Sequence, residues 1–220
     1  MNDNIPIKQR LYIRFGKFDA LIYTSNLDVA KTWERVLRRA NLPILYSQGF
    51  NTRPRIILAS ALPLGISSEC EILDVSMREP IELTNVVERI QATSPAGLRI
   101  YEITEVPVRS GTLPTRVRSS EYRIHFEDGM ERTDLQARVD KLIGSDTLLK
   151  TKEVKGKPVS VNVRPLVYDL HIDANGDLIT HLTVGDRGNM RPDEILSEMG
   201  LADAVVSIHR FQLHIDPNPT

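Results

Sequence analysis

The chain has 220 residues, of which 41% are hydrophobic and 26% are charged, and its formal net charge is −1. This composition is typical of an ordinary globular protein with a buried core, and it argues against a protein that coats nucleic acid non-specifically. No apolar run approaches the roughly 20 residues that span a bilayer, so no membrane span is expected.

The start of the chain lacks the basic residues and the apolar run of a signal peptide. A single cysteine, Cys70, cannot form a disulfide within the chain, and such cysteine usage is typical of a reducing compartment. We therefore expect a cytoplasmic location.

The first hundred residues predict six elements in the order β-α-β-β-α-β. Residues 10–16 alternate apolar and polar side chains, as in a half-buried strand, and apolar residues then recur at helical spacing from Val29 to Ala40. This order is that of a ferredoxin-like domain, whose antiparallel sheet has both helices on one face and leaves the other face free to bind. The predicted strands are 10–16, 56–61, 71–77 and 98–106, and the predicted helices are 29–40 and 83–92.

The same pattern is predicted to repeat in the second half of the chain. A stretch at 109–120, rich in proline, glycine and serine, predicts a linker. Asn175-Gly176 between two alternating runs predicts a hairpin. We therefore predict an α+β fold of two tandem ferredoxin-like (βαββαβ) domains with antiparallel sheets, at 1–108 and 121–220. The repeated elements are strands at 122–126, around 160–172, at 178–184 and at 205–215, and helices at 132–143 and 192–199.

The stretch 46–65 is chemically richer than a connecting loop needs to be. It places Phe50 and Asn51 beside Arg53 and Arg55, which flank a proline. An aromatic ring, an amide and two guanidinium groups offer stacking, edge recognition and phosphate contact together. The stretch therefore predicts a ligand surface, and the alternative is a turn whose arginines make internal caps and ion pairs.

Charge is unevenly distributed along the chain. Residues 31–55 sum to +5 and residues 147–168 to +4, so the remaining residues sum to −10. Lys31, Arg35 and Arg38 share one face of the predicted helix, and Arg164, before a proline, is expected to project from an edge strand or bulge. This segregation favours a face that meets a polyanion, and the alternative for the helix is a solvated face.

Motifs of common catalytic and metal sites are absent from the sequence. There is no G-x-S-x-G, H-E-x-x-H or P-loop pattern. His209 and His214 are five apart in a predicted strand and so face opposite sides, while the other three histidines are isolated and are expected to be structural. We therefore predict no metal site and no catalytic residue in this chain.

Four stretches, 42–55, 62–69, 155–167 and 188–196, resemble the bacterial radical-SAM-linked protein family, a domain of unknown function. The resemblance covers nearly the whole chain, although Thr52 stands where the family has proline and Asn26 where it has histidine. It implies an accessory protein fused to, or encoded beside, a radical SAM enzyme with a cobalamin-binding type of domain. The iron-sulfur cluster, S-adenosylmethionine and any cobalamin would then belong to the partner, and this chain would hold no cofactor.

The resulting hypothesis is a non-catalytic module that binds structured RNA, such as tRNA or rRNA, in a basic cleft and presents it to that enzyme. One alternative is a docking subunit for the partner enzyme that binds no nucleic acid. Another is a stand-alone enzyme acting on RNA or an anionic substrate, with Glu69, Glu71 or Asp74 as acid or base. The predicted binding residues are Lys31, Arg35, Arg38, Ser47, Gln48, Phe50, Asn51, Arg53, Arg55, Lys155, Lys157 and Arg164.

Overall fold

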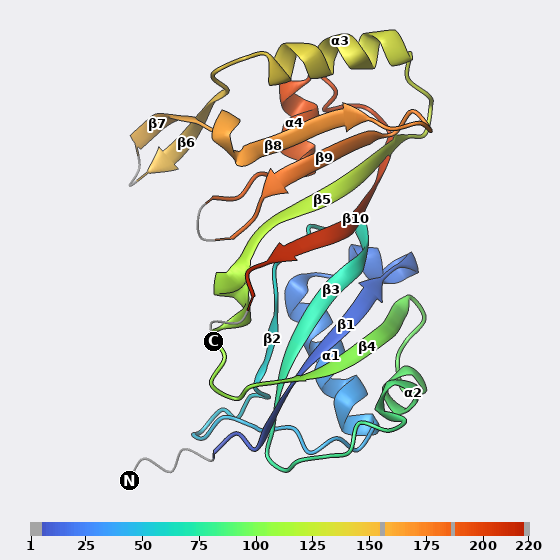
Figure 1. Ribbon diagram of the computed structural model, residues 1–220, viewed down its shortest axis with the longest axis vertical. Helices are drawn as coiled ribbons and strands as arrows, with labels where there is room; N and C mark the ends of the chain where they lie inside the picture. Colours follow the sequence, from blue (N-terminus) through green and yellow to red (C-terminus); the bar gives the residue numbers. More distant parts are fainter. Residues whose placement is uncertain (1–5, 155–156, 186–187, 218–220) are drawn as a thin grey trace. The chain divides into compact units, whose positions relative to one another are not determined.

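The computed structural model describes residues 6–154, 157–185 and 188–217 (Figure 1). The chain divides into two compact units, Met1–Val117 together with Asp216–Thr220, and Arg118–Ile215. Each unit combines helices with an antiparallel sheet, which confirms the predicted α+β class. In the described part of the chain, no helix is both long enough and apolar enough to cross a membrane.

The first unit has a sheet in the order β4-β1-β3, with β2 paired to β3. All three pairings are antiparallel. The predicted order of elements is confirmed, although the second strand is only three residues long. The elements are β1 (Gln9–Lys17), η1 (Asp19–Tyr23), α1 (Asn26–Arg39), β2 (Ile56–Leu58), β3 (Ile66–Met77), α2 (Val86–Gln91), β4 (Leu98–Val106) and η2 (Leu113–Arg116).

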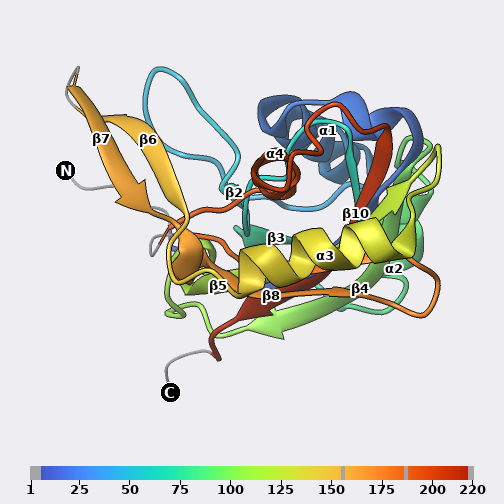
Figure 2. The same ribbon diagram turned by 90° about the horizontal axis from the view of Figure 1, so that it is seen from above.

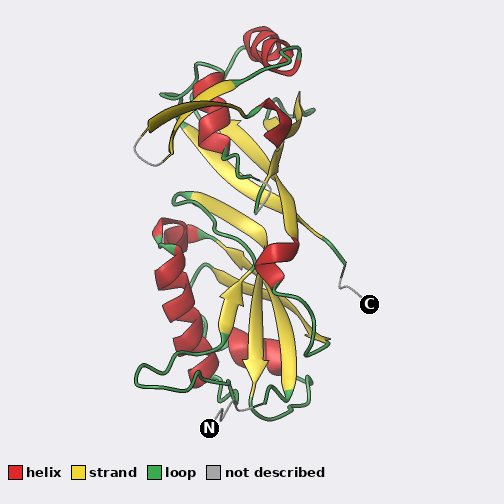
Figure 3. Cartoon of the chain, turned by 90° about the vertical axis from the view of Figure 1, so that its left-hand side faces the viewer, coloured by secondary structure: helices red, strands yellow, loops and turns green. Residues whose placement is uncertain are grey.

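Alternation along β1 sends Leu11, Ile13 and Phe15 into a core that α1 and α2 cover from the same side. The ring of Trp33 on α1 is fully buried and meets Phe15 edge-on, with ring centroids 4.9 Å apart. Helix α1 begins at a true cap, because Ser25 Oγ accepts a hydrogen bond from the Asp28 N–H. Figure 3 shows α1 as the long red helix along one side of these strands.

The opposite face of this sheet is partly covered, so the prediction that it is free to bind is wrong there. Residues 109–120, predicted as a linker, contain η2 and the first residues of β5. Leu113 is fully buried, and Arg116 donates to the Tyr12 hydroxyl at 3.0 Å. Arg10 reaches the carbonyl of Gly111 at 3.1 Å. The segment after β4 therefore packs as part of the first unit.

The second unit has a sheet in the order β10-β5-β9-β8. Helix α3 has the predicted bounds, and the hairpin between β8 and β9 turns at Asn175-Gly176 as predicted, with Gly176 at φ +90°. The single strand predicted around residues 160–172 is wrong, because η3 divides it: its start lies in β7 and its end is β8. β7 pairs with β6 in a separate two-stranded ribbon, and β6 was not predicted (Figure 1). The elements are β5 (Val117–Phe126), α3 (Arg132–Ile143), β6 (Leu149–Val154), β7 (Lys157–Asn162), η3 (Arg164–Leu166), β8 (Val167–Ile172), β9 (Leu178–Thr183), α4 (Pro192–Glu198) and β10 (Val206–Ile215).

Candidate functional site

Residues 44–56 form an irregular hairpin, called here the central hairpin. The Leu45 N–H donates to the Ser76 carbonyl at 2.8 Å, which ties one arm to β3. The Arg55 N–H donates to the Leu45 carbonyl at 2.8 Å, and Tyr46 and Pro54 face each other as an isolated bridge. Backbone pairing therefore fixes both arms, and residues 48–52 remain as the hairpin tip.

The hairpin tip is exposed along its whole length. Phe50 shows 104% of its reference surface, so its ring packs against nothing in the protein. Gly49 adopts φ +117°, a backbone conformation that side-chain-bearing residues rarely take. Figure 2 shows this segment as the pale-blue loop that extends away from α1. The sequence motif therefore presents an aromatic ring to solvent on a fixed support.

A groove of about 790 Å³ runs beside the first arm of the central hairpin. Arg38, in the last turn of α1, lines it together with Ser47, Gln48 and Thr52. Arg78 also lines it and lies 3.6 Å from Glu79. Three of the predicted binding residues thus share one groove of mixed polar and apolar lining, although they come from a helix and a loop.

The two arginines of the motif have different surroundings. Arg53 is exposed, whereas Arg55 is half-buried and lines a second pocket of about 430 Å³. In the part of the chain that the structure describes, neither the Arg38 nor the Arg53 side chain is in an ion pair. These two guanidinium groups are therefore available to an outside anion.

The predicted basic face of α1 is exposed. Lys31, Arg35 and Arg38 all face solvent, and Lys31 Nζ lies 3.4 Å from Asp28 Oδ1. The Ser25 hydroxyl, followed by the Lys31 ammonium, lowers the pKa of Asp28. The first turn of the helix thus has its own charge pair, and Arg38 is the residue that reaches the groove.

The predicted binding residues of the second unit are Lys155, Lys157 and Arg164, and the structure does not add them to the candidate surface. Lys155 and the side chain of Lys157 lie outside the described residues. Arg164 does not project: its guanidinium donates to the carbonyls of Ile143, Ser145 and Val167 at 3.0, 3.1 and 2.8 Å. That prediction is wrong because the carbonyls at the end of α3 need donors and Arg164 supplies them. The described candidate surface therefore lies in the first unit.

The carboxylate of Asp74, considered as a catalytic group, is committed to a buried ion pair. Arg10 Nε donates to Asp74 Oδ1 at 2.9 Å, and the two side chains are only 8% and 3% exposed. The hydrogen bond to Asp74 raises the pKa of Arg10. Glu71 is also buried. Asp74 is therefore committed to a buried pair with Arg10 and is poorly accessible to a substrate.

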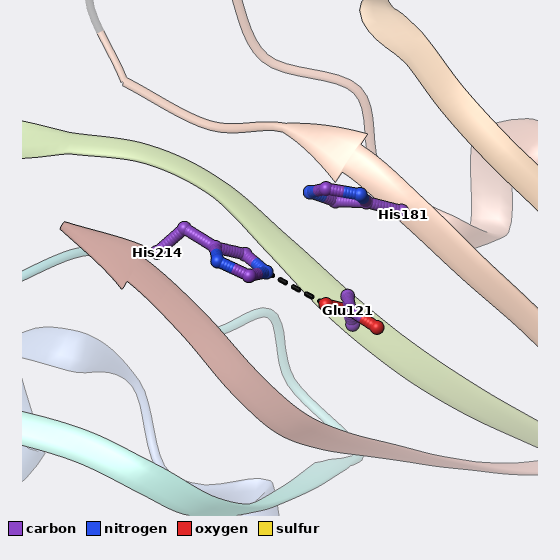
Figure 4. Close-up of side chains that lie close together, drawn as sticks. All are labelled: Glu121, His181 and His214. Carbon is purple, nitrogen blue, oxygen red and sulfur yellow. Dashed lines mark hydrogen bonds and ion pairs between the residues drawn. The ribbon is translucent and has the colours of Figure 1, made fainter.

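One cluster of side chains was missed by the sequence analysis, which treated His181 as isolated. Glu121, His181 and His214 come together in the second unit, called here the His-Glu cluster (Figure 4). Their ligand atoms all lie within 4.8 Å of one another. Burial lowers the pKa of His181. Spacing along the chain could not reveal the cluster, because its members belong to three different strands.

Comparison with protein families identifies the chain. Residues 10–192 match the model of a family described as "Uncharacterized protein conserved in bacteria (DUF2344)". The chain belongs to this family. The DUF2344 match includes the whole central hairpin as well as Glu121 and His181. It supports a bacterial family of unknown function, and it carries no link to radical SAM enzymes.

Curated proteins and solved structures add little. No curated protein matches the chain. A chain in "Crystal Structure of a Cbf5-Nop10-Gar1 Complex" is similar, with a TM-score of 0.45 and 13% identity. The match covers 95% of this DUF2344 chain and 49% of that chain, so the present chain spans about half of its length. A likeness at this level carries no argument about function.

Proposed function

We propose that this protein is a recognition module that binds structured RNA through the central hairpin and holds it for a partner radical SAM enzyme. The observation that carries the proposal is the fully exposed Phe50 ring on a hairpin whose arms are fixed by backbone hydrogen bonds. A fully exposed aromatic ring on a supported loop can stack on an unpaired base, as aromatic side chains of RNA-binding proteins do.

The groups around Phe50 suit the rest of a nucleotide. Stacking of one base on an aromatic ring contributes about 1–3 kcal/mol. Arg53 on the same hairpin and Arg38 beside the groove can contact phosphates, and Asn51 at the tip can hydrogen-bond a base edge. A base, its edge and its phosphates could thus be bound by one exposed surface.

The groove can accept a sugar-phosphate backbone. Its lining includes the Ser47 and Thr52 hydroxyls and the Gln48 amide, together with Arg38 and Arg78. Hydroxyl and amide groups of this kind make many of the contacts between proteins and phosphate or sugar. Each phosphate contact of this kind releases counterions from the RNA, so such binding should weaken steeply as salt is raised.

We also propose that both units are variants of the ferredoxin-like domain. The strand orders β4-β1-β3-β2 and β10-β5-β9-β8 both correspond to the order 4-1-3-2 of that fold, once the β6-β7 ribbon is treated as an insertion. In this view α1 and the central hairpin are the first helix and the following connection of the first domain.

The partner enzyme enters the proposal through the sequence motifs that resemble the radical-SAM-linked family. The chain has one cysteine, Cys70, so it cannot by itself supply the thiolates of an iron-sulfur cluster. The cluster, S-adenosylmethionine and any cobalamin would be bound by the partner. Arg38, Phe50 and Arg53 would place the RNA for that partner.

Ultraviolet crosslinking of the purified protein to tRNA and to ribosomal RNA fragments, with the crosslinked peptides mapped by mass spectrometry, tests the proposal. We expect crosslinks within residues 44–56, centred on Phe50, that increase when salt is lowered. Peptides that contain Arg164 should remain unlinked, since that side chain is turned inward. Crosslinks confined to the second unit would contradict the proposal.

Two alternatives predict other outcomes. If the central hairpin docks onto the partner enzyme, RNA should not crosslink to it. The two proteins should then co-purify from nuclease-treated extract, and replacement of Phe50 should abolish the co-purification. If the chain is an enzyme in its own right, the isolated protein modifies RNA and loses that activity on Glu69→Gln.

A further inference from the structure

The His-Glu cluster lies on the sheet of the second unit. Glu121 on β5 is the direct register partner of His181 on β9, and His214 comes from β10 on the other side of β5. His214 Nε2 lies 2.6 Å from Glu121 Oε1, and the three ligand atoms lie within 4.8 Å of one another (Figure 4). All three residues are half-buried, so solvent can reach them.

Neighbouring groups hold the two imidazole rings in place. Ser119 Oγ lies 2.8 Å from His181 Nε2, and Ser119 itself is buried. The His181 ring meets Tyr168 edge-on at 5.0 Å and lies tilted against the His214 ring at 4.8 Å. A histidine that binds a metal usually donates its other ring N–H to an oxygen, and the Ser119 hydroxyl can accept that bond.

We propose that Glu121, His181 and His214 bind one divalent transition-metal ion of the zinc class. Two imidazoles and one carboxylate are the protein ligands of the catalytic type of zinc site, which keeps a fourth position open for water or substrate. The proposal is independent of RNA binding, because it uses only residues of the second unit.

The geometry needs only a small adjustment to hold an ion. Tetrahedral ligands about 2.1 Å from zinc stand about 3.4 Å apart. The Glu121–His214 contact of 2.6 Å would therefore widen by about 0.8 Å, and the longest separation would shorten by up to about 1.4 Å. The Glu121 and His214 side chains are 26% and 40% exposed, so both have room to rotate toward an ion.

Two other histidines of the same unit provide a contrast. His125 pairs with Asp177 and His171 with Asp169, each at 2.7 Å. In the part of the chain that the structure describes, neither pair has a third group that could serve as a metal ligand. A histidine-carboxylate pair alone is therefore common on this sheet, and the second imidazole distinguishes the His-Glu cluster.

Titration of metal-free, tag-free protein with Zn²⁺ by calorimetry, and with Co²⁺ by visible absorption, tests the proposal. We expect one ion per chain and a Co²⁺ spectrum of a site with fewer than six ligands. His181→Asn and His214→Asn should each weaken binding by at least about tenfold. Mg²⁺, which prefers oxygen ligands, should bind more weakly than Zn²⁺.

Matched variants make the result specific. His171→Asn removes an exposed imidazole from a similar histidine–carboxylate pair and should change the Zn²⁺ affinity by less than about twofold. Cys70→Ser in the first unit should also change the affinity by less than about twofold. Circular dichroism without metal verifies that each variant is folded, and Glu121→Gln, close in shape to the original, is the second ligand variant. Absence of stoichiometric binding, or affinity unchanged in folded His214→Asn, would overturn the proposal.

Discussion

Ser47 and Arg53 close the central hairpin through two hydrogen bonds. The Ser47 N–H donates to the Arg53 carbonyl at 2.8 Å, and the Arg53 N–H donates to Ser47 Oγ at 2.9 Å. The Ser47 side chain, predicted to bind a ligand, therefore also supports the loop that carries Phe50. The sequence motif specifies a conformation as well as a surface.

Ser47→Ala should loosen the hairpin tip, because it removes the acceptor of the Arg53 N–H. The local free energy of opening should fall by about 1 kcal/mol, the usual contribution of one hydrogen bond. Hydrogen exchange measured by mass spectrometry should show faster exchange at the Arg53 amide, with β3 unchanged. Unchanged exchange at Arg53 would contradict the structural role.

Asp74→Ala should destabilise the first unit strongly, because it leaves the buried Arg10 guanidinium without its carboxylate. Removal of one partner from a buried ion pair costs about 3–5 kcal/mol. Glu79→Ala is the matched control, since its pair with Arg78 is exposed and should contribute less than about 1 kcal/mol. Urea unfolding of both variants measures the difference, and equal losses would refute this account.

Arg164→Ala should destabilise the second unit without weakening RNA binding. The variant loses donors to three backbone carbonyls, which corresponds to a cost of about 1–3 kcal/mol. Arg132→Ala, whose exposed side chain makes one hydrogen bond to the Asp173 carbonyl, is the control for charge. A large loss of RNA affinity with normal stability would restore Arg164 as a binding residue.

The His125–Asp177 pair predicts a pH dependence of stability. The hydrogen bond to Asp177 raises the pKa of His125, and the nearby Glu127 acts in the same direction, while Arg123 lies 3.8 Å from Asp177. A raised pKa means that the folded state favours the proton. The stabilisation is therefore complete below the ordinary histidine pKa and disappears as pH rises through the folded-state pKa.

His125→Gln should accordingly reduce the decline in stability between about pH 6 and pH 8, the range where histidine titrates. Urea midpoints measured across this range for both proteins test the prediction. An equally steep decline in His125→Gln would contradict the assignment.

Local patterns predicted the regular elements well, because those patterns encode local structure. The apolar spacing from Val29 to Ala40 placed most of α1, and Asn175-Gly176 placed the turn between β8 and β9. The bounds of α3 were predicted without error. The second strand of the first unit was predicted too long, because apolar residues continue beyond Leu58 after its pairing with β3 has ended.

Long-range relationships could not be predicted in the same way. The residues after Val106 appeared to be a linker because proline and glycine interrupt them, yet Leu113 is buried against the first unit. Arg164 was predicted to be exposed beside a proline, whereas its guanidinium donates a hydrogen bond to the Ile143 carbonyl at the end of α3, about twenty residues earlier. Both outcomes depend on backbone carbonyls and apolar surfaces of elements distant in the sequence, which need a donor or a cover when the chain folds.

In the candidate surface, too, local features were predicted from the sequence and long-range ones were not. Phe50 and Arg53 were recognised from one short motif, but only the structure brings Arg38 to the groove that Ser47 lines. The His-Glu cluster depends on strand pairing across residues 121–214, so no spacing rule could have indicated it. Motifs within one loop are visible in a sequence, whereas sites assembled by a sheet are not.

The most direct test of RNA recognition is fluorescence anisotropy with labelled tRNA and ribosomal RNA fragments at two salt concentrations. The proteins compared are wild type, Phe50→Ala with Arg53→Ala, and a control with Arg132→Ala and Lys141→Ala, two exposed cations of α3. We predict salt-sensitive binding that the hairpin variant loses by at least about tenfold and the control retains. Equal affinity in all three proteins, or no binding by wild type, would contradict RNA recognition by the central hairpin.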